Sequence, residues 1–243
     1  SWDCAVVCNR SMASVAVALV IVLGACGGDG ATRGHPPDDP NLPGMFVPSQ
    51  GRGHFNYLYS PDRLPTAFCD GVPWSGAVTP QPGAVPTPTP QPDAAPPRDC
   101  YNSNPPTSGQ HLAVQANVTL ANGFVLTRIP PDADVYPPEI EVPREAIPHI
   151  LEHAGVFVGY HCAAGDAVCH DVVERLEDVV NDRIDNHNDR VVMARDSDLL
   201  IGTVGLASWT RIDTFGYAAF DEDRVVEFID VHSCRFDPEN FCD

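Results

Sequence analysis

The hydrophobic and polar positions between residues 156 and 209 predict an alternation of strands with a helix. Val156 to Tyr160 is a short apolar run and predicts a strand. The segment from Val168 to His187 repeats apolar residues at helical spacing, with acids and arginines opposite them, and predicts an amphipathic helix. Val191 to Ala194 and Leu199 to Trp209 predict two more strands, and the glycines of the second suggest a bend or bulge.

A last helix is predicted through Val225 to Val231. Asp221 is suited to cap it, and Glu222 and Asp223 are favourable near its positive end. The element order is then strand, helix, strand, strand, helix. Two strands joined by a helix should be parallel, and the next strand can turn back antiparallel. We therefore predict an α+β domain with a mixed sheet, and a thioredoxin-like arrangement is the alternative.

An apolar run between Met12 and Cys26 predicts an export signal. It follows Arg10 and is shorter than the roughly 20 residues that span a bilayer. Its end, Leu23 to Cys26, resembles a bacterial lipobox, in which the cysteine becomes the lipidated first residue. We expect residues 1–26 to be a signal peptide and Cys26 to anchor the protein in the membrane of the cell envelope. An ordinary cleaved signal is the alternative, and we interpret residues 1–11, upstream of Met12, as an extension of the gene model.

Composition divides the rest of the chain into a tether and a domain. Residues 27–99 are rich in proline, and the repeats from Thr79 to Pro92 predict extended polyproline II structure. The piece from His54 to Trp74 is aromatic enough to fold back onto the domain. Globular periodicities begin near Cys100, so we expect the folded domain to span residues 100–243.

The charge of the chain excludes several functions. The net charge is −19, and all 14 basic residues are arginines, which rules out a lysine Schiff base and a P-loop lysine. Such an acidic chain is a poor partner for nucleic acid. Most acids follow Asp132, where they are typical of a solvated acidic exterior.

The cysteines predict a disulfide framework. Without Cys4, Cys8 and the lipobox cysteine, six remain in an exported chain: Cys69, Cys100, Cys162, Cys169, Cys234 and Cys242. Short spacing favours the pairs Cys162–Cys169 and Cys234–Cys242. Cys69 and Cys100 would then bracket the proline-rich stretch. No Cys-x-x-Cys spacing supports a redox-active site.

The densest group of chemically active residues is His149-x-x-Glu152-His153. On a helix, positions four apart share a face, so both histidines could reach one metal ion while Glu152 supports a water or completes the shell. Pro148 and Gly155 are suited to begin and end a short helix. The same string is the inverted zinc-peptidase motif, in which the glutamate is a general base. A zinc hydrolase would need a further ligand, for which Glu227 is the candidate.

A second polar segment runs from Tyr101 to His111. Its prolines and glycine impose a fixed loop, and its short polar side chains can bond to local backbone. His111 at its end is either a capping residue or a third metal ligand.

Several segments together carry a family resemblance: Asn104 to His111, Val135-Tyr136, His149 to Gly155, Val156 to Tyr160 with Cys162 and Cys169, Ser208-Trp209, Phe220-Asp221 and Phe228-Ile229. Over about residues 100 to 235 the chain resembles the bacterial domain-of-unknown-function family numbered 3105, which is found in exported and membrane-anchored proteins. The chain departs at Ala154, where the family usually has the first of two glycines, and at Gln110, where a proline is frequent. The resemblance implies no established activity, but it implies that His111, His149, Glu152 and His153 belong to one recurring pattern.

We therefore expect an exported lipoprotein whose domain binds a metal and is not an enzyme. The ligands would be His111, His149 and His153, with Glu152 as the fourth ligand or as a residue that orients one of them. Imidazoles without free thiolates suit Cu(II) or Zn(II), and the oxidising compartment favours copper over zinc. The alternatives are an envelope interaction module with structural histidines and a zinc hydrolase. The sequence indicates no particular protein partner.

Overall fold

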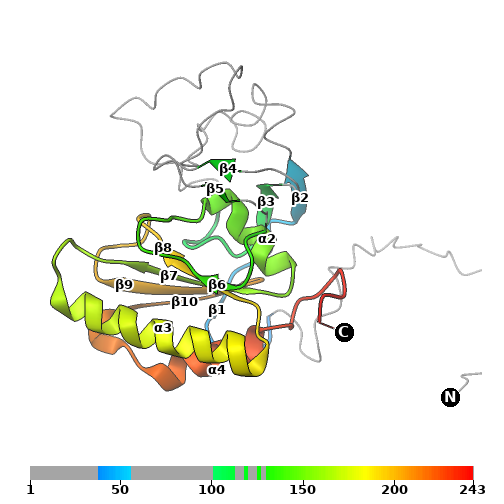
Figure 1. Cartoon of the computed structure of the whole chain (residues 1–243). Helices are drawn as coiled ribbons and strands as arrows, with labels where there is room; N and C mark the ends of the chain where they lie inside the picture. The colour runs from blue at the N-terminus through cyan, green and yellow to red at the C-terminus, as the bar shows by residue number, and fades with distance from the viewer. Residues whose placement is uncertain (1–37, 56–100, 113–117, 120–124, 127–129, 243) are drawn as a thin grey trace, which may run out of the picture.

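A mixed sheet forms the centre of the fold. The computed structural model describes residues 38–55, 101–112, 118–119, 125–126 and 130–242. The strands of the sheet are β1 (Met45–Phe46), β6 (Asp134–Val135), β7 (Val156–His161), β8 (Val191–Arg195), β9 (Thr203–Ser208) and β10 (Arg211–Gly216). Within the described residues these six strands have the order β1-β10-β9-β7-β8-β6 (Figure 1). Helices and strands thus combine in the predicted α+β class, and the thioredoxin-like alternative stays a prediction.

The remaining elements flank this sheet. The helical segments are η2 (Arg144–Ala146), α2 (Ile147–Glu152), α3 (Ala167–His187), η3 (Tyr217–Ala219) and α4 (Glu222–His232). The shorter strand pairs are the parallel β2 (Arg52–Phe55) with β3 (Gly109–Leu112), and the antiparallel β4 (Val118–Thr119) with β5 (Val125–Leu126). None of the helices in the described ranges is long and apolar enough to cross a membrane.

The strand directions follow from the connections. β7 and β8 are parallel and are joined by α3, as predicted, while β9 runs antiparallel to β7 on its other side. The hairpin partner of β9, β10, was not predicted. Only Ile212 and Phe215 supply buried apolar side chains to β10, which breaks the alternation of a half-buried strand. The hairpin turn is Trp209-Thr210, without the usual Asn-Gly or Asp-Gly signal, and Thr210 itself adopts the left-handed conformation, with φ +61°.

The two long helices form where the capping signals stand. The Asp166 side chain accepts hydrogen bonds from the backbone N–H groups of Val168 and Cys169, and α3 ends at Asn188 in a left-handed conformation. Asp221 caps α4 by accepting a hydrogen bond from the backbone N–H of Asp223. Both predicted helices are therefore confirmed.

The sheet separates two hydrophobic cores. α3 and α4 lie along one face and α2 lies on the other (Figure 1). Side chains alternate between the two faces along β7, because Val156 and Val158 enter the core under α3 whereas Phe157 enters the core under α2. Leu176 of α3 is fully buried in the first core and Leu151 of α2 is buried in the second. The predicted site residues on α2 thus lie over one face of the sheet.

Part of the predicted tether belongs to the fold. β1 pairs with β10, and β2 pairs with β3. The buried Arg211 guanidinium donates hydrogen bonds to the backbone carbonyls of Leu42 and Gly44, at 3.4 and 3.1 Å. Leu42 and Val47 are buried as well, so this segment packs against the domain despite its tether-like composition. The signal peptide and most of the proline-rich stretch lie outside the described residues.

Two of the predicted disulfides are present. Cys162 pairs with Cys169, and Cys234 pairs with Cys242, as their short spacing favoured. Cys26, Cys69 and Cys100 lie outside the described residues. Disulfides of this kind are typical of proteins exposed to an oxidising compartment.

Candidate functional site

The two histidines of the His-x-x-Glu-His string face each other. α2 carries Pro148 in its first turn and ends at Glu152, and His153 is its C-cap residue. The backbone N–H of His153 donates to the carbonyl of His149 at 3.1 Å, which completes one helical turn. The Nε2 atoms of the two imidazoles are consequently 3.1 Å apart, in a buried position.

A tight turn connects this helix to β7. Ala154 has a left-handed backbone, with φ +66°, so it adopts the conformation for which a glycine would be suited. Gly155 follows, and a Cβ atom at this position would lie only 2.7 Å from the Ile150 carbonyl oxygen. The turn therefore has the shape of a two-glycine turn although alanine holds its first position.

His111 reaches the same place from β3. Its ring is fully buried, with its centroid 4.9 Å from that of His149. Its Nδ1 lies 2.8 Å from the Gly109 carbonyl oxygen, and its Nε2 lies 2.8 Å from Glu152 Oε2. The structure thus brings all four predicted ligands, His111, His149, Glu152 and His153, into one cluster.

The His111 contacts restrict where its protons can be. A carbonyl oxygen only accepts hydrogen bonds, so Nδ1 donates to Gly109. Nε2 of a neutral ring then presents its lone pair to the Glu152 carboxylate. His111 Nε2 and Glu152 Oε2 are then two acceptors only 2.8 Å apart, and their lone pairs repel each other unless a proton or a metal cation lies near them.

A polar loop positions β3 and His111. The buried Arg144 guanidinium donates hydrogen bonds to the side chain of Asn104 and, at 3.3 Å, to the Asp198 carboxylate. Asn104 in turn donates to the Asp198 carbonyl at 2.7 Å. Asp196, beside this network, is almost fully buried, and burial raises its pKa to about 6 against the opposing effect of Arg144.

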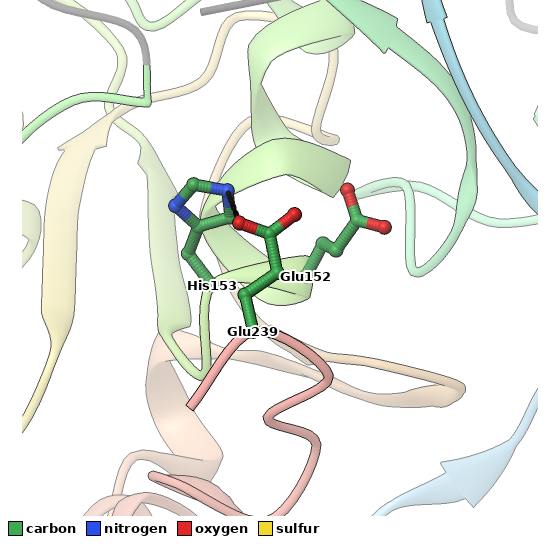
Figure 2. A group of neighbouring side chains, drawn as sticks. All are labelled: Glu152, His153 and Glu239. Carbon is green, nitrogen blue, oxygen red and sulfur yellow. Dashed lines mark ion pairs between the residues drawn. The ribbon is translucent and has the colours of Figure 1, made fainter. Parts of the chain in front are cut away.

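Two charged residues at the cluster were not predicted. Arg52 on β2 lies 3.4 Å from Glu152 Oε1, and the carboxylate beside His153 is that of Glu239, at 3.6 Å, rather than that of Glu227. Figure 2 shows Glu239 rising from the C-terminal segment toward His153, with Glu152 on the adjacent position of the helix end. One donor atom from each of Glu152, His153 and Glu239 lies within 4.8 Å of the others.

Their sequence surroundings explain why these two were missed. Arg52 lies in a proline- and glycine-rich region that reads as tether, and nothing in its spacing points to the histidines. Glu239 lies inside the short loop that the Cys234–Cys242 pair closes. The short spacing of these two cysteines was the one sequence signal that could have indicated that the Glu239 carboxylate is held in a fixed position.

A small cavity adjoins the cluster at His153. The cavity that His153 lines, together with Ile150, Gly155 and Arg190, has a volume of only about 10 Å³. This is about the space that one water molecule occupies. A groove of about 560 Å³ lies elsewhere, between α3 and the ends of β7 and β8, and contains none of the four predicted ligands. We place the candidate site at the histidines because the convergent donor atoms are there.

Comparison with known proteins identifies a family. No curated protein and no solved structure matches the chain. The model of a family described as "protein of unknown function (DUF3105)" matches residues 98–242, which is more than half of the chain and includes the four clustered residues. The chain therefore belongs to this family of proteins of unknown function.

Proposed function

We propose that this domain binds one copper or zinc ion through His111, His149 and His153. Glu152 is the fourth ligand or the residue that orients His111. The observation that carries the proposal is the 3.1 Å separation of the His149 and His153 Nε2 atoms. Two imidazole nitrogens at 2.0–2.1 Å from a tetrahedral zinc ion lie roughly 3.3 Å apart. The pair therefore has almost the spacing that a shared ion requires.

The environment of His111 supports the same ion. Metal-binding histidines usually donate their second ring N–H to a carboxylate or a backbone carbonyl, which fixes the ring. The Nδ1 contact of His111 with the Gly109 carbonyl is of this kind and leaves Nε2 directed at the cluster. Imidazoles with carboxylates and no free thiolate suit Zn(II) or Cu(II).

The cavity beside His153 has room for an ion and not for an organic substrate. Pockets for small-molecule ligands are about 300–1,000 Å³, whereas the space beside His153 is about 10 Å³. We therefore develop metal binding, ahead of a zinc hydrolase. We assign no reaction to Glu152.

Structural histidines are the competing explanation, and a specific feature favours them. The His149–His153 and His111–Glu152 contacts are also short enough to be hydrogen bonds. An envelope interaction module would use these bonds to hold the core. The two explanations differ in one measurable respect, because only the first predicts stoichiometric metal binding at this cluster.

A competition titration separates them. The oxidised protein is titrated with Zn²⁺ and, separately, with Cu²⁺ against a chromophoric chelator of known affinity. We expect one ion per chain in the wild type and a loss of affinity of at least tenfold in each of His111→Ala, His149→Ala and His153→Ala, because each removes a ligand. His187→Ala is the control, since this half-exposed histidine lies on α3. Wild-type affinity in the three cluster variants would overturn the proposal.

We also propose that the domain is exported and anchored in the cell envelope through Cys26. The two disulfides support an oxidising location. The test is fractionation of cells that express the full chain: the wild type should partition into detergent with the membranes, and Cys26→Ser should be released as a soluble protein. Equal partitioning of both would contradict a lipid anchor at Cys26.

A further inference from the structure

We propose that residues 234–242 form a cap over the metal site, held in place by the Cys234–Cys242 disulfide, and that Glu239 on this cap is the fourth ligand of the ion, with Glu152 orienting His111. We call these residues the cap loop. The inference rests on the proposed function, because the cap loop would supply the outermost ligand of the same ion and the path by which the ion enters.

The base of the cap loop is fixed to the domain. The backbone N–H of Cys234 donates to the Ala154 carbonyl at 2.9 Å, directly beside the histidines of α2. Phe236 is buried, and its ring stacks on that of Trp209 with centroids 4.5 Å apart and planes inclined by only 4°. The disulfide to Cys242 returns the chain to this base. The loop is thus closed covalently over a short span.

The tip of the cap loop is also ordered by its own hydrogen bonds. The Asp237 carboxylate accepts from the backbone N–H of Phe241 at 2.8 Å and from that of Cys242 at 2.9 Å. Asn240 adopts a left-handed backbone conformation, with φ +57°, which turns the chain between Asp237 and Phe241. These bonds hold Glu239 and Phe241 on one side of the loop.

Both side chains are directed at His153. Phe241 stacks on its ring with centroids 4.3 Å apart, and Glu239 Oε2 lies 3.6 Å from its Nε2 atom. A nitrogen and a carboxylate oxygen on one tetrahedral ion are roughly 3.4 Å apart. The Glu239 oxygen is therefore close to the position of a ligand, without a change in the loop.

The exposure of these residues indicates how an ion reaches the site. The side chain of Glu239 is 45% exposed, whereas that of His153 is 7% exposed. Glu239 therefore lies between the solvent and the buried imidazoles, and its negative charge attracts a cation to that side. Phe241 covers the ring beside it. The cap loop thus supplies both the entry carboxylate and the cover of the site.

The disulfide makes this inference testable, because the chain contains a second disulfide as a matched control. Zn²⁺ affinity and the rate of Zn²⁺ removal by a chelator are measured on the wild type, Cys234→Ala/Cys242→Ala, Cys162→Ala/Cys169→Ala and Glu239→Gln. Alanine is preferable to chemical reduction, because free thiols would themselves bind the metal. Circular dichroism and a thermal melt establish that each variant is folded.

We expect Glu239→Gln and the Cys234/Cys242 variant to bind Zn²⁺ at least about tenfold more weakly and to release it faster, by analogy with the loss of other groups around a metal. The Cys162/Cys169 variant should keep the wild-type affinity and release rate. Glu239→Gln tests the ligand even if the cysteine variant does not fold. Wild-type behaviour of a folded Glu239→Gln protein overturns the inference. A wild type that binds no metal overturns the proposed function instead, so the two failures are distinguishable.

Discussion

Replacement of Asp196 by asparagine should change how the stability of the domain depends on pH. Asp196 is 7% exposed. Its Oδ1 accepts a hydrogen bond from the Asp198 backbone N–H at 3.0 Å, and its Oδ2 has no hydrogen-bond partner among the described residues. Burial raises its pKa from 3.8 to about 6. Each pKa unit corresponds to about 1.4 kcal/mol, so ionisation of this carboxyl costs the folded state about 3 kcal/mol.

The sign follows from the raised pKa of an acid. Between pH 3.8 and about 6 the folded state binds more protons at this site than the unfolded state, so the contribution of Asp196 to stability decreases as pH rises. Above about pH 6 the loss is complete. The asparagine of the variant does not titrate, and its amide oxygen can still accept the bond from Asp198. Any constant cost of the amide shifts the whole curve and does not affect its slope.

The assay is urea unfolding of the oxidised wild type and Asp196→Asn at pH 4, 5, 6 and 7. The free energy of unfolding of the variant minus that of the wild type should increase by about 2.4 kcal/mol from pH 4 to pH 7 and then level off. Val168→Ala, at an exposed position on α3, removes no titrating group, so it is the control and should give a difference that stays constant. A constant difference for Asp196→Asn as well would refute the assignment of a buried, destabilising carboxylate.

Three further predictions concern the core, the turn and a buried histidine. Leu176→Ala should lower the free energy of unfolding by about 2–5 kcal/mol because Leu176 is fully buried, whereas Val168→Ala, at a 63% exposed position on the same helix, should change it by less than about 0.5 kcal/mol; urea unfolding measures both. Gly155→Ala should destabilise the fold by more than about 1 kcal/mol and weaken Zn²⁺ binding, because the new Cβ atom would lie 2.7 Å from the Ile150 carbonyl oxygen and displace the turn after α2. An unchanged melting temperature and an unchanged Zn²⁺ affinity would contradict this. Burial lowers the pKa of His232 from 6.5 to about 3, so between these values the unfolded state binds more protons and the stability of the domain rises with pH. His232→Gln should reduce the slope of unfolding free energy against pH, measured by urea unfolding, by up to about 1.4 kcal/mol per pH unit. An unchanged slope would count against this reasoning.

The parts of the fold that the sequence predicts are those whose signals are local. α3 and α4 combine an apolar stripe with an aspartate cap, and both form where these signals stand. β10 was missed because its side chains do not alternate and its turn relies on Thr210 in a left-handed conformation. β1 was missed because it has only two residues, which are too few to show an alternation of polar and apolar side chains. It is held by backbone pairing with β10.

The candidate site divides in the same way. The four-residue spacing places His149 and His153 on one face of a helix, and a proline-containing loop places His111, so these histidines are accessible to sequence reasoning. Arg52 reaches the cluster from β2, far before α2 in the sequence, and Glu239 reaches it from the segment that follows the last helix. Their contacts depend on tertiary packing, which periodicity does not encode.

The most direct test of metal binding is the metal content of the chain as a cell exports it. The full protein is expressed with its own export signal, purified in the oxidised form without added metal, and analysed for copper and zinc beside a His149→Ala/His153→Ala variant. We expect about one copper or zinc ion per wild-type chain and almost none in the variant. Equal metal content in the two proteins, or a folded wild type that contains no metal and takes up none when copper or zinc is added, would contradict it.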